Sequence, residues 1–149
     1  MRQFMSLREN LAALKAHATI SVVDDDESVR NSLKRLLRSM EFEVRTFPSA
    51  LEFLHHGSLH DHGCVIVDVR MPEMNGLDLQ KRLSDSGVSL PVIFITAYED
   101  PGARAQAMQA GALAFLQKPF SDPLLIDAIG LALERSNQQI SNNRQQGSI

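Results

Sequence analysis

The feature that most constrains the fold is an alternation of short apolar runs with amphipathic stretches, which repeats five times from Ala18 onward. Each apolar run has the length of a strand, and each following stretch carries apolar residues at helical spacing. The run Cys64–Val67 is apolar throughout, as expected for a strand covered on both faces. Such repeats predict an α/β fold, a doubly wound five-stranded parallel sheet with helices on both faces. The expected strands are 20–23, 43–47, 64–67, 91–95 and 113–116.

The second strand candidate, Glu43–Phe47, is the most polar of the set, so we expect it at an edge of the sheet. Because crossovers between parallel strands are right-handed, few topologies remain. The order 2-1-3-4-5 of flavodoxin-like folds suits one polar strand and four apolar ones. Apolar content alone does not determine the place of the fifth strand.

Capping residues mark where the helices begin. Asp26 precedes the first helical pattern, and Ser49 stands three residues before Glu52, which is the spacing of a capping box. Asp100 precedes a proline at the first helical position. A last helix is expected to begin at 121–123. The residues expected on its buried side are Leu125, Ile129 and Leu133.

The two ends of the chain differ from its middle. Residues 1–17 form an N-terminal extension whose apolar spacing permits a short helix, with a frayed extension as the alternative. The folded domain is expected to span 18–135. Residues 136–149 are rich in Ser, Asn and Gln, which is typical of a polar linker or tail. Either the chain ends in a loose tail, or an output domain follows it.

Composition excludes several classes of protein. The net charge of −3 provides no basic footprint, so we expect no direct nucleic-acid binding by this segment. Cys64 is the single cysteine of the 149 residues, which rules out an internal disulfide and suits a reducing compartment. No apolar run approaches the roughly 18 residues that a membrane span needs, and no secretion signal is recognisable. A cytoplasmic protein without a membrane contact is expected.

Polar residues follow four of the predicted strands, namely Asp24 with Asp25, then Asp68, Thr96 and Lys118. In open parallel sheets, ligands bind outside the carboxyl ends of the strands, so these residues should converge. Converging carboxylates repel one another, and Lys118 together with a hard cation such as Mg²⁺ would compensate. Asp68 is then placed to attack an activated phosphoryl group, with a hydrogen bond from Thr96. Each residue alone has a simpler structural role, and their joint occurrence carries the prediction.

Four segments resemble the receiver domain of bacterial two-component response regulators. Within that family, the sequence is most similar to the FixJ-type regulators. The resemblance covers about residues 18–135, with all four motifs in order. The segments are Ile20–Arg30 (ISVVDDDESVR), Val65–Gly76 (VIVDVRMPEMNG), Val92–Ala97 (VIFITA) and Phe115–Phe120 (FLQKPF).

The resemblance implies that Asp68 accepts a phosphoryl group from a sensor histidine kinase. It implies that Asp24 and Asp25 hold Mg²⁺ with Asp68, joined by the backbone carbonyl of Arg70. Lys118 would pair with the phosphoryl group. The chain would catalyse its own phosphorylation and dephosphorylation, and would not turn over an external substrate.

The resemblance also implies a switch made by Thr96 and Phe115. Thr96 would move toward the new phosphoryl oxygens, and Phe115, which stands where many members have tyrosine, would fill the vacated space. The face made by the fourth helix, the fifth strand and the fifth helix of the repeat would then change shape. It would control an output partner, a second copy in a homodimer, or a missing DNA-binding domain. The Lys118–Pro119 bond is expected to be cis.

Two positions leave the rate of phosphate loss open. Arg70 and Tyr98 stand two residues beyond Asp68 and Thr96. The resemblance implies that these positions border the route of the hydrolytic water. Bulky side chains there can slow or speed the loss of the phosphoryl group. The sequence does not determine the direction.

Three rival functions fit the sequence less well. The main alternative is a phosphorylation-independent pseudo-receiver, an interaction module, which the intact Asp25, Asp68, Thr96 and Lys118 disfavour. An aspartate-nucleophile phosphatase requires an acid two residues after the nucleophile, where this chain has Arg70. A P-loop nucleotide hydrolase is disfavoured because the glycine-rich lysine motif is missing from the sequence.

A histidine cluster lies outside these motifs. The spacing of its members matches no helical ligand pair, and the neighbouring glycines indicate an exposed loop. A transition-metal site there is therefore a minor hypothesis. The four histidines are His55, His56, His60 and His62.

Overall fold

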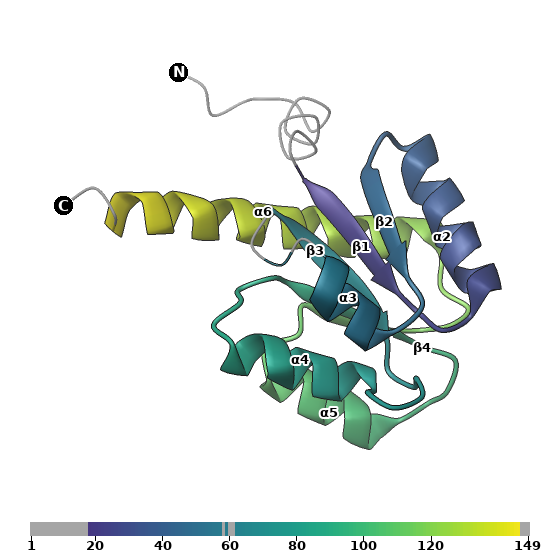
Figure 1. The fold of residues 1–149 in the computed structure, drawn as a ribbon. Helices are drawn as coiled ribbons and strands as arrows, with labels where there is room; N and C mark the ends of the chain where they lie inside the picture. Colours follow the sequence, from purple (N-terminus) through teal and green to yellow (C-terminus); the bar gives the residue numbers. More distant parts are fainter. Residues whose placement is uncertain (1–17, 58, 60–61, 147–149) are drawn as a thin grey trace.

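Five parallel strands form one sheet in the order β2-β1-β3-β4-β5 (Figure 1). The computed structural model describes residues 18–57, 59 and 62–146. The predicted doubly wound fold and its strand order are therefore confirmed, including the place of the fifth strand, which apolar content had left open. The strands are β1 (Thr19–Val23), β2 (Glu43–Phe47), β3 (Gly63–Asp68), β4 (Val92–Thr96) and β5 (Ala114–Gln117).

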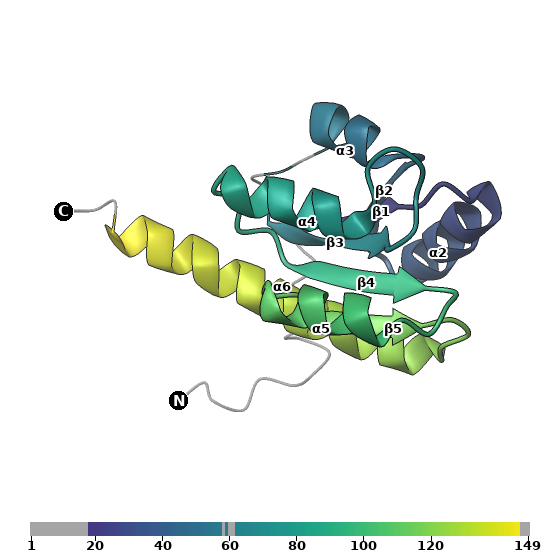
Figure 2. The same cartoon turned by 90° about the horizontal axis from the view of Figure 1, so that it is seen from below.

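Helices cover both faces of the sheet (Figure 2). Neighbouring strand residues point to opposite faces, so Ile66 joins a core with α2 and α6, whereas Val67 joins a core with α3, α4 and α5. Among the described helices, none is both long and apolar enough to cross a bilayer. The helices are α2 (Glu27–Ser39), α3 (Ala50–His56), α4 (Gly76–Asp85), α5 (Pro101–Gln109) and α6 (Asp122–Gln146).

Strand register determines which residues meet at the carboxyl edge. Val23 of β1 lies level with Val67 of β3. Asp24 directly follows Val23, and Asp68 directly follows Val67. The two acids therefore lie side by side at the carboxyl ends of neighbouring strands. In the same way, Thr96 of β4 lies level with Gln117 of β5, one residue before Lys118.

The predicted caps are confirmed. The Asp26 carboxylate accepts a hydrogen bond from the amide of Ser28 at 2.8 Å and begins α2. Ser49 Oγ accepts from the amide of Glu52 at 3.1 Å and begins α3. Asp100 caps α5 through the amide of Ala103 at 3.0 Å. These side chains satisfy amide groups that a helix cannot pair internally.

Helix α6 continues past the predicted end of the domain at residue 135. Ser136 is only 5% exposed. Its hydroxyl accepts a hydrogen bond from the amide of Gly63 at 3.0 Å and lies 2.9 Å from Nδ1 of His62. The polar segment that begins at Ser136 is thus helical to Gln146. Its first residue, Ser136, binds the start of β3. Its role as a linker stays a prediction, and the N-terminal extension 1–17 lies outside the described residues.

Replacing Ser136 by alanine is expected to destabilise the fold. The change leaves the buried amide of Gly63 without its acceptor, which costs about 1–3 kcal/mol. Urea unfolding of the wild type and Ser136→Ala measures the difference. Ser39→Ala serves as the control, because that hydroxyl binds the Leu36 carbonyl at an exposed site where water can replace it. Equal stabilities of Ser136→Ala and the wild type would show that the contact is not stabilising.

Candidate functional site

The carboxyl edge of the sheet gathers three carboxylates. Oxygens of Asp24, Asp25 and Asp68 lie within 4.8 Å of one another. Asp24 is completely buried, and its Oδ1 accepts a hydrogen bond from the amide of Asp26 at 2.9 Å. Asp68 Oδ1 accepts from the amide of Arg70 at 3.1 Å. The convergence predicted from the strand ends is therefore present.

Lys118 supplies the cation of the cluster. Its Nζ lies 3.4 Å from Asp24 Oδ2 and 3.8 Å from Asp68 Oδ2. The backbone orients it, because the amide of Lys118 donates to the carbonyl of Thr96 at 2.7 Å. The Lys118–Pro119 bond is cis, as predicted. One ammonium group thus faces two acids that are far apart in the sequence.

The surroundings of Asp68 shift its ionisation. Burial, followed by the neighbouring charge of Asp24, raises the pKa of Asp68 to about 6. The amide of Arg70 and the charge of Lys118 work in the opposite direction and lower this pKa. Removing a carboxylate from water disfavours its charged form, and a second carboxylate nearby adds to the effect.

The donor set fits a hard divalent cation. Its ligands would be carboxylate oxygens from two neighbouring strands, with one side chain, Asp25, exposed to solvent. Mg²⁺ is bound through a small number of carboxylates while it keeps several waters. A cation at this place would also offset the repulsion that raises the pKa of Asp68. Asp24, Asp25 and Asp68 are the described residues that would hold it.

The two predicted switch residues lie on the neighbouring strands β4 and β5. Thr96 is 1% exposed, and its hydroxyl exchanges hydrogen bonds with the backbone of Tyr98, donating to the carbonyl at 3.3 Å and accepting from the amide at 3.2 Å. Phe115 is only 7% exposed and packs on Phe94 with ring centroids 6.0 Å apart. The aromatic side chain therefore already occupies an inward position here.

Arg70 joins two loops at the rim of the site. Its guanidinium lies 3.4 Å from Asp100 Oδ2 and 4.8 Å from the centre of the Tyr98 ring. Both contacts are solvent-exposed and individually weak. The cavity beside them has a volume of about 520 Å³. It is lined by Val69, Arg70, Met71, Pro72, Asn75, Leu77, Asp100 and Ala103.

Two residues near the cluster were not singled out from the sequence. A Cβ at Gly76 would lie 2.5 Å from the carbonyl oxygen of Asp68, so only glycine permits α4 to begin this close to the acid. Arg30 Nη1 donates to the carbonyl of Asp24 at 2.7 Å. Both residues lie inside the quoted motifs, but spacing does not reveal contacts with backbone atoms.

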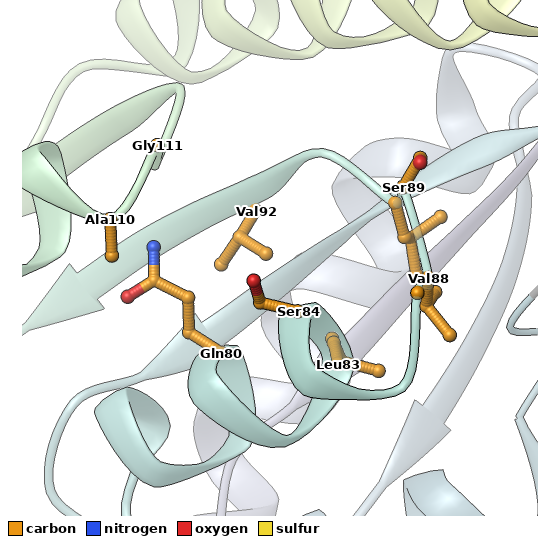
Figure 3. Close-up of a pocket in the computed structure, with 10 residues that line it drawn as sticks. Gln80, Leu83, Ser84, Val88, Ser89, Val92, Ala110 and Gly111 are labelled. Atoms are coloured by element: carbon orange, nitrogen blue, oxygen red, sulfur yellow. The ribbon is translucent and has the colours of Figure 1, made fainter.

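A second hollow lies beside Val92, the first residue of β4 (Figure 3). Its volume is about 250 Å³, and it lies between α4, the end of α5 and the start of β4. Gln80 reaches across it and donates to the carbonyl of Ala107 at 3.1 Å. Its lining residues are neutral, so it offers none of the chemistry gathered at the carboxyl edge. The histidine hypothesis stays a prediction, because His60 lies outside the described residues.

Replacing Asp68 by asparagine is expected to stabilise the metal-free protein at high pH. The pKa of Asp68 is higher in the folded chain than in the unfolded chain, so between about pH 4 and pH 6 the folded chain binds more protons. The free energy of unfolding therefore falls as pH rises through this window. The free energy of unfolding of Asp68→Asn should be about 2–3 kcal/mol larger than that of the wild type at pH 8. This difference should disappear toward pH 4.

Urea unfolding in the presence of a chelator, repeated from pH 4 to pH 8, measures this difference. Asp85→Asn is the matched control, because that carboxylate is exposed and forms an ion pair with Lys81 at 3.1 Å within its own helix. The free energy of unfolding of this control should stay within about 0.5 kcal/mol of the wild-type value at every pH. A less stable Asp68→Asn at pH 8 would contradict the assigned electrostatics.

Comparison with known proteins assigns the family. The family model of the response regulator receiver domain matches residues 20–130. The transcriptional regulatory protein TdiR of Thauera aromatica is 48% identical over 130 residues, which cover 86% of this chain and 57% of TdiR. The transcriptional regulatory protein FixJ of Azorhizobium caulinodans is 42% identical over 120 residues, with 80% of this chain and 57% of FixJ covered.

A solved structure agrees with these matches. The response regulator StyR superposes with a TM-score of 0.84 at 44% identity, covering 88% of this chain and 66% of StyR. The chain thus spans less than two thirds of the length of these relatives. Its matched region includes every strand residue from Ile20 to Gln117 and all the acids of the cluster. The chain belongs to the response regulator receiver domain family.

Proposed function

We propose that this receiver domain accepts a phosphoryl group on Asp68 in the presence of Mg²⁺. The observation that carries the proposal is the meeting of three carboxylates and one ammonium group at the carboxyl edge of the sheet. The donor would be a sensor histidine kinase, as the family resemblance implies. The expected localisation of this chain is the cytoplasm.

Each residue has a proposed role in the transfer. Asp68 is the nucleophile, and Lys118 pairs with an oxygen of the incoming group. Asp24 and Asp25 hold Mg²⁺ with Asp68 and the backbone carbonyl of Arg70. When bound, the cation neutralises charge on the phosphoryl oxygens. Because the reaction needs mainly positioning and charge neutralisation, a general base is unnecessary.

The ionisation of Asp68 supports this assignment. A nucleophilic carboxylate must be charged, yet burial and Asp24 raise its pKa to about 6. This value already includes the lowering effect of Lys118, and a bound divalent cation would lower the pKa further. Asp68 is therefore ionised at neutral pH while remaining only 13% exposed.

The response to phosphorylation would begin at Thr96. To donate to a phosphoryl oxygen, its hydroxyl must give up the hydrogen bond that it donates to the carbonyl of Tyr98. The Phe115 side chain is already buried against Phe94. Its part in the switch would therefore be to stabilise this inward position, not to move into it after phosphorylation. The result would be a population shift between two packings of the α5–β5–α6 face.

The same face offers apolar side chains to a partner. We propose that it contacts an output domain or a second copy of the chain. The relatives TdiR and FixJ are named transcriptional regulatory proteins and are longer than this chain, which supports a DNA-binding output beyond it. The exposed apolar residues on or beside the face are Tyr98, Met108, Leu124 and Leu131.

Labelling with a small phosphodonor tests the acceptor. Purified protein incubated with acetyl phosphate and Mg²⁺ should gain one phosphoryl group by intact mass, and Asp68→Asn should gain none. Asp85→Asn, which removes an exposed carboxylate far from the cluster, should be labelled like the wild type. Undiminished labelling of Asp68→Asn would exclude Asp68, and an unlabelled wild type would favour the pseudo-receiver.

Removal of the metal tests the acidic cluster separately. A chelator should abolish labelling, and added Mg²⁺ should restore it. Asp25→Asn should raise the Mg²⁺ concentration needed for half-maximal labelling by about 10-fold or more, because a carboxylate ligand is lost. Asp85→Asn, at the end of α4, is the control, because that exposed carboxylate lies outside the acidic cluster. Labelling that is independent of Mg²⁺ would contradict the proposed metal site.

A further inference from the structure

Arg30 connects helix α2 to the turn that carries two of the acids. Its Nη1 donates to the carbonyl of Asp24 at 2.7 Å, and its backbone amide donates to the carbonyl of Asp26 at 3.0 Å. The side chain is only partly exposed. One residue therefore binds both ends of the turn from Asp24 to Asp26.

The rest of the turn is held by a small number of other bonds. The amide of Asp24 donates to the carbonyl of Phe47 at 3.1 Å, and the Asp24 carboxylate accepts from the amide of Asp26 at 2.9 Å. Phe47 thus fixes the peptide before Asp24. The carbonyl bound by Arg30 belongs to the next peptide, which joins Asp24 to Asp25.

We propose that Arg30 is a positioning residue of the acidic site. By holding the carbonyl of Asp24, it fixes the plane of the peptide between Asp24 and Asp25. That plane determines whether both carboxylates face Asp68 at once. The inference rests on the proposed function, because it assigns Arg30 a part in Mg²⁺ binding.

The charge of Arg30 alone predicts the opposite effect. A guanidinium close to the cluster repels a divalent cation, and this repulsion is strongest where solvent is partly excluded. If Arg30 acted through charge only, its removal would tighten Mg²⁺ binding. If it acts by positioning, its removal loosens binding in spite of the gain in negative charge. The sign of the change in affinity therefore separates the two roles.

Mg²⁺ titration of the purified chain, followed by backbone amide chemical shifts, provides the test. Arg30→Gln is expected to raise the Kd for Mg²⁺ by about 10-fold or more, as is usual for residues that orient metal ligands. Arg38→Gln is the matched control, because it makes the same change in charge in the last turn of the same helix, where the side chain is exposed. Its Kd should equal the wild-type value or fall slightly.

A second variant covers the case in which Arg30→Gln does not fold. Arg30→Lys keeps the charge but loses the planar fork of donors, so its Kd should rise by a smaller factor. Urea unfolding of both metal-free variants separates loss of the fold from loss of affinity. An Arg30→Gln protein that folds and binds Mg²⁺ as tightly as the wild type, or more tightly, overturns the inference. If Arg30→Gln does not fold, wild-type affinity in Arg30→Lys overturns it.

The wild-type titration keeps this inference separate from the proposed function. A wild type that does not bind Mg²⁺ at millimolar concentration overturns the metal site, and the role of Arg30 falls with it. A wild type that binds, together with an Arg30→Gln protein of equal or higher affinity, overturns only the positioning role.

Discussion

The repulsion between Asp24 and Asp68 is the constraint on which the rest of the site depends. Parallel pairing of β1 with β3 brings both acids to the same height, and burial of Asp24 removes the water that would screen them. Lys118 offsets this repulsion only because β5 ends at the same edge, two strands away from β3. The sheet therefore holds together charges that would separate in a flexible chain.

Much of this arrangement is predictable from local sequence patterns. The bounds of β2, the caps at Asp26, Ser49 and Asp100, and the buried side of α6 all follow from periodicity and side-chain chemistry. The convergence of the acids follows from the general rule for open parallel sheets. These predictions succeed because each depends on neighbours in the sequence or on the fold class alone.

Contacts between distant atoms are not predictable in this way. Ser136 binds the amide of Gly63, 73 residues earlier in the chain, and nothing in a polar segment indicates that its first hydroxyl is buried. The direction of the Thr96 hydroxyl and the inward position of Phe115 depend on side-chain rotamers, which packing determines. The bond from Arg30 to a backbone carbonyl has no sequence signature at all.

Helix α6 gives this small domain a mechanical property. It begins four residues after Lys118, at the carboxyl ends of the strands, and Ser136 binds it to the amide of Gly63 at the start of β3. At 1.5 Å per residue, its 25 residues form a rod of about 37 Å, with about 15 Å beyond the Ser136 fastening. Because Leu125, Ile129 and Leu133 hold the part of α6 before Ser136 in the core, a tilt of that part would also displace the 10 residues that follow Ser136.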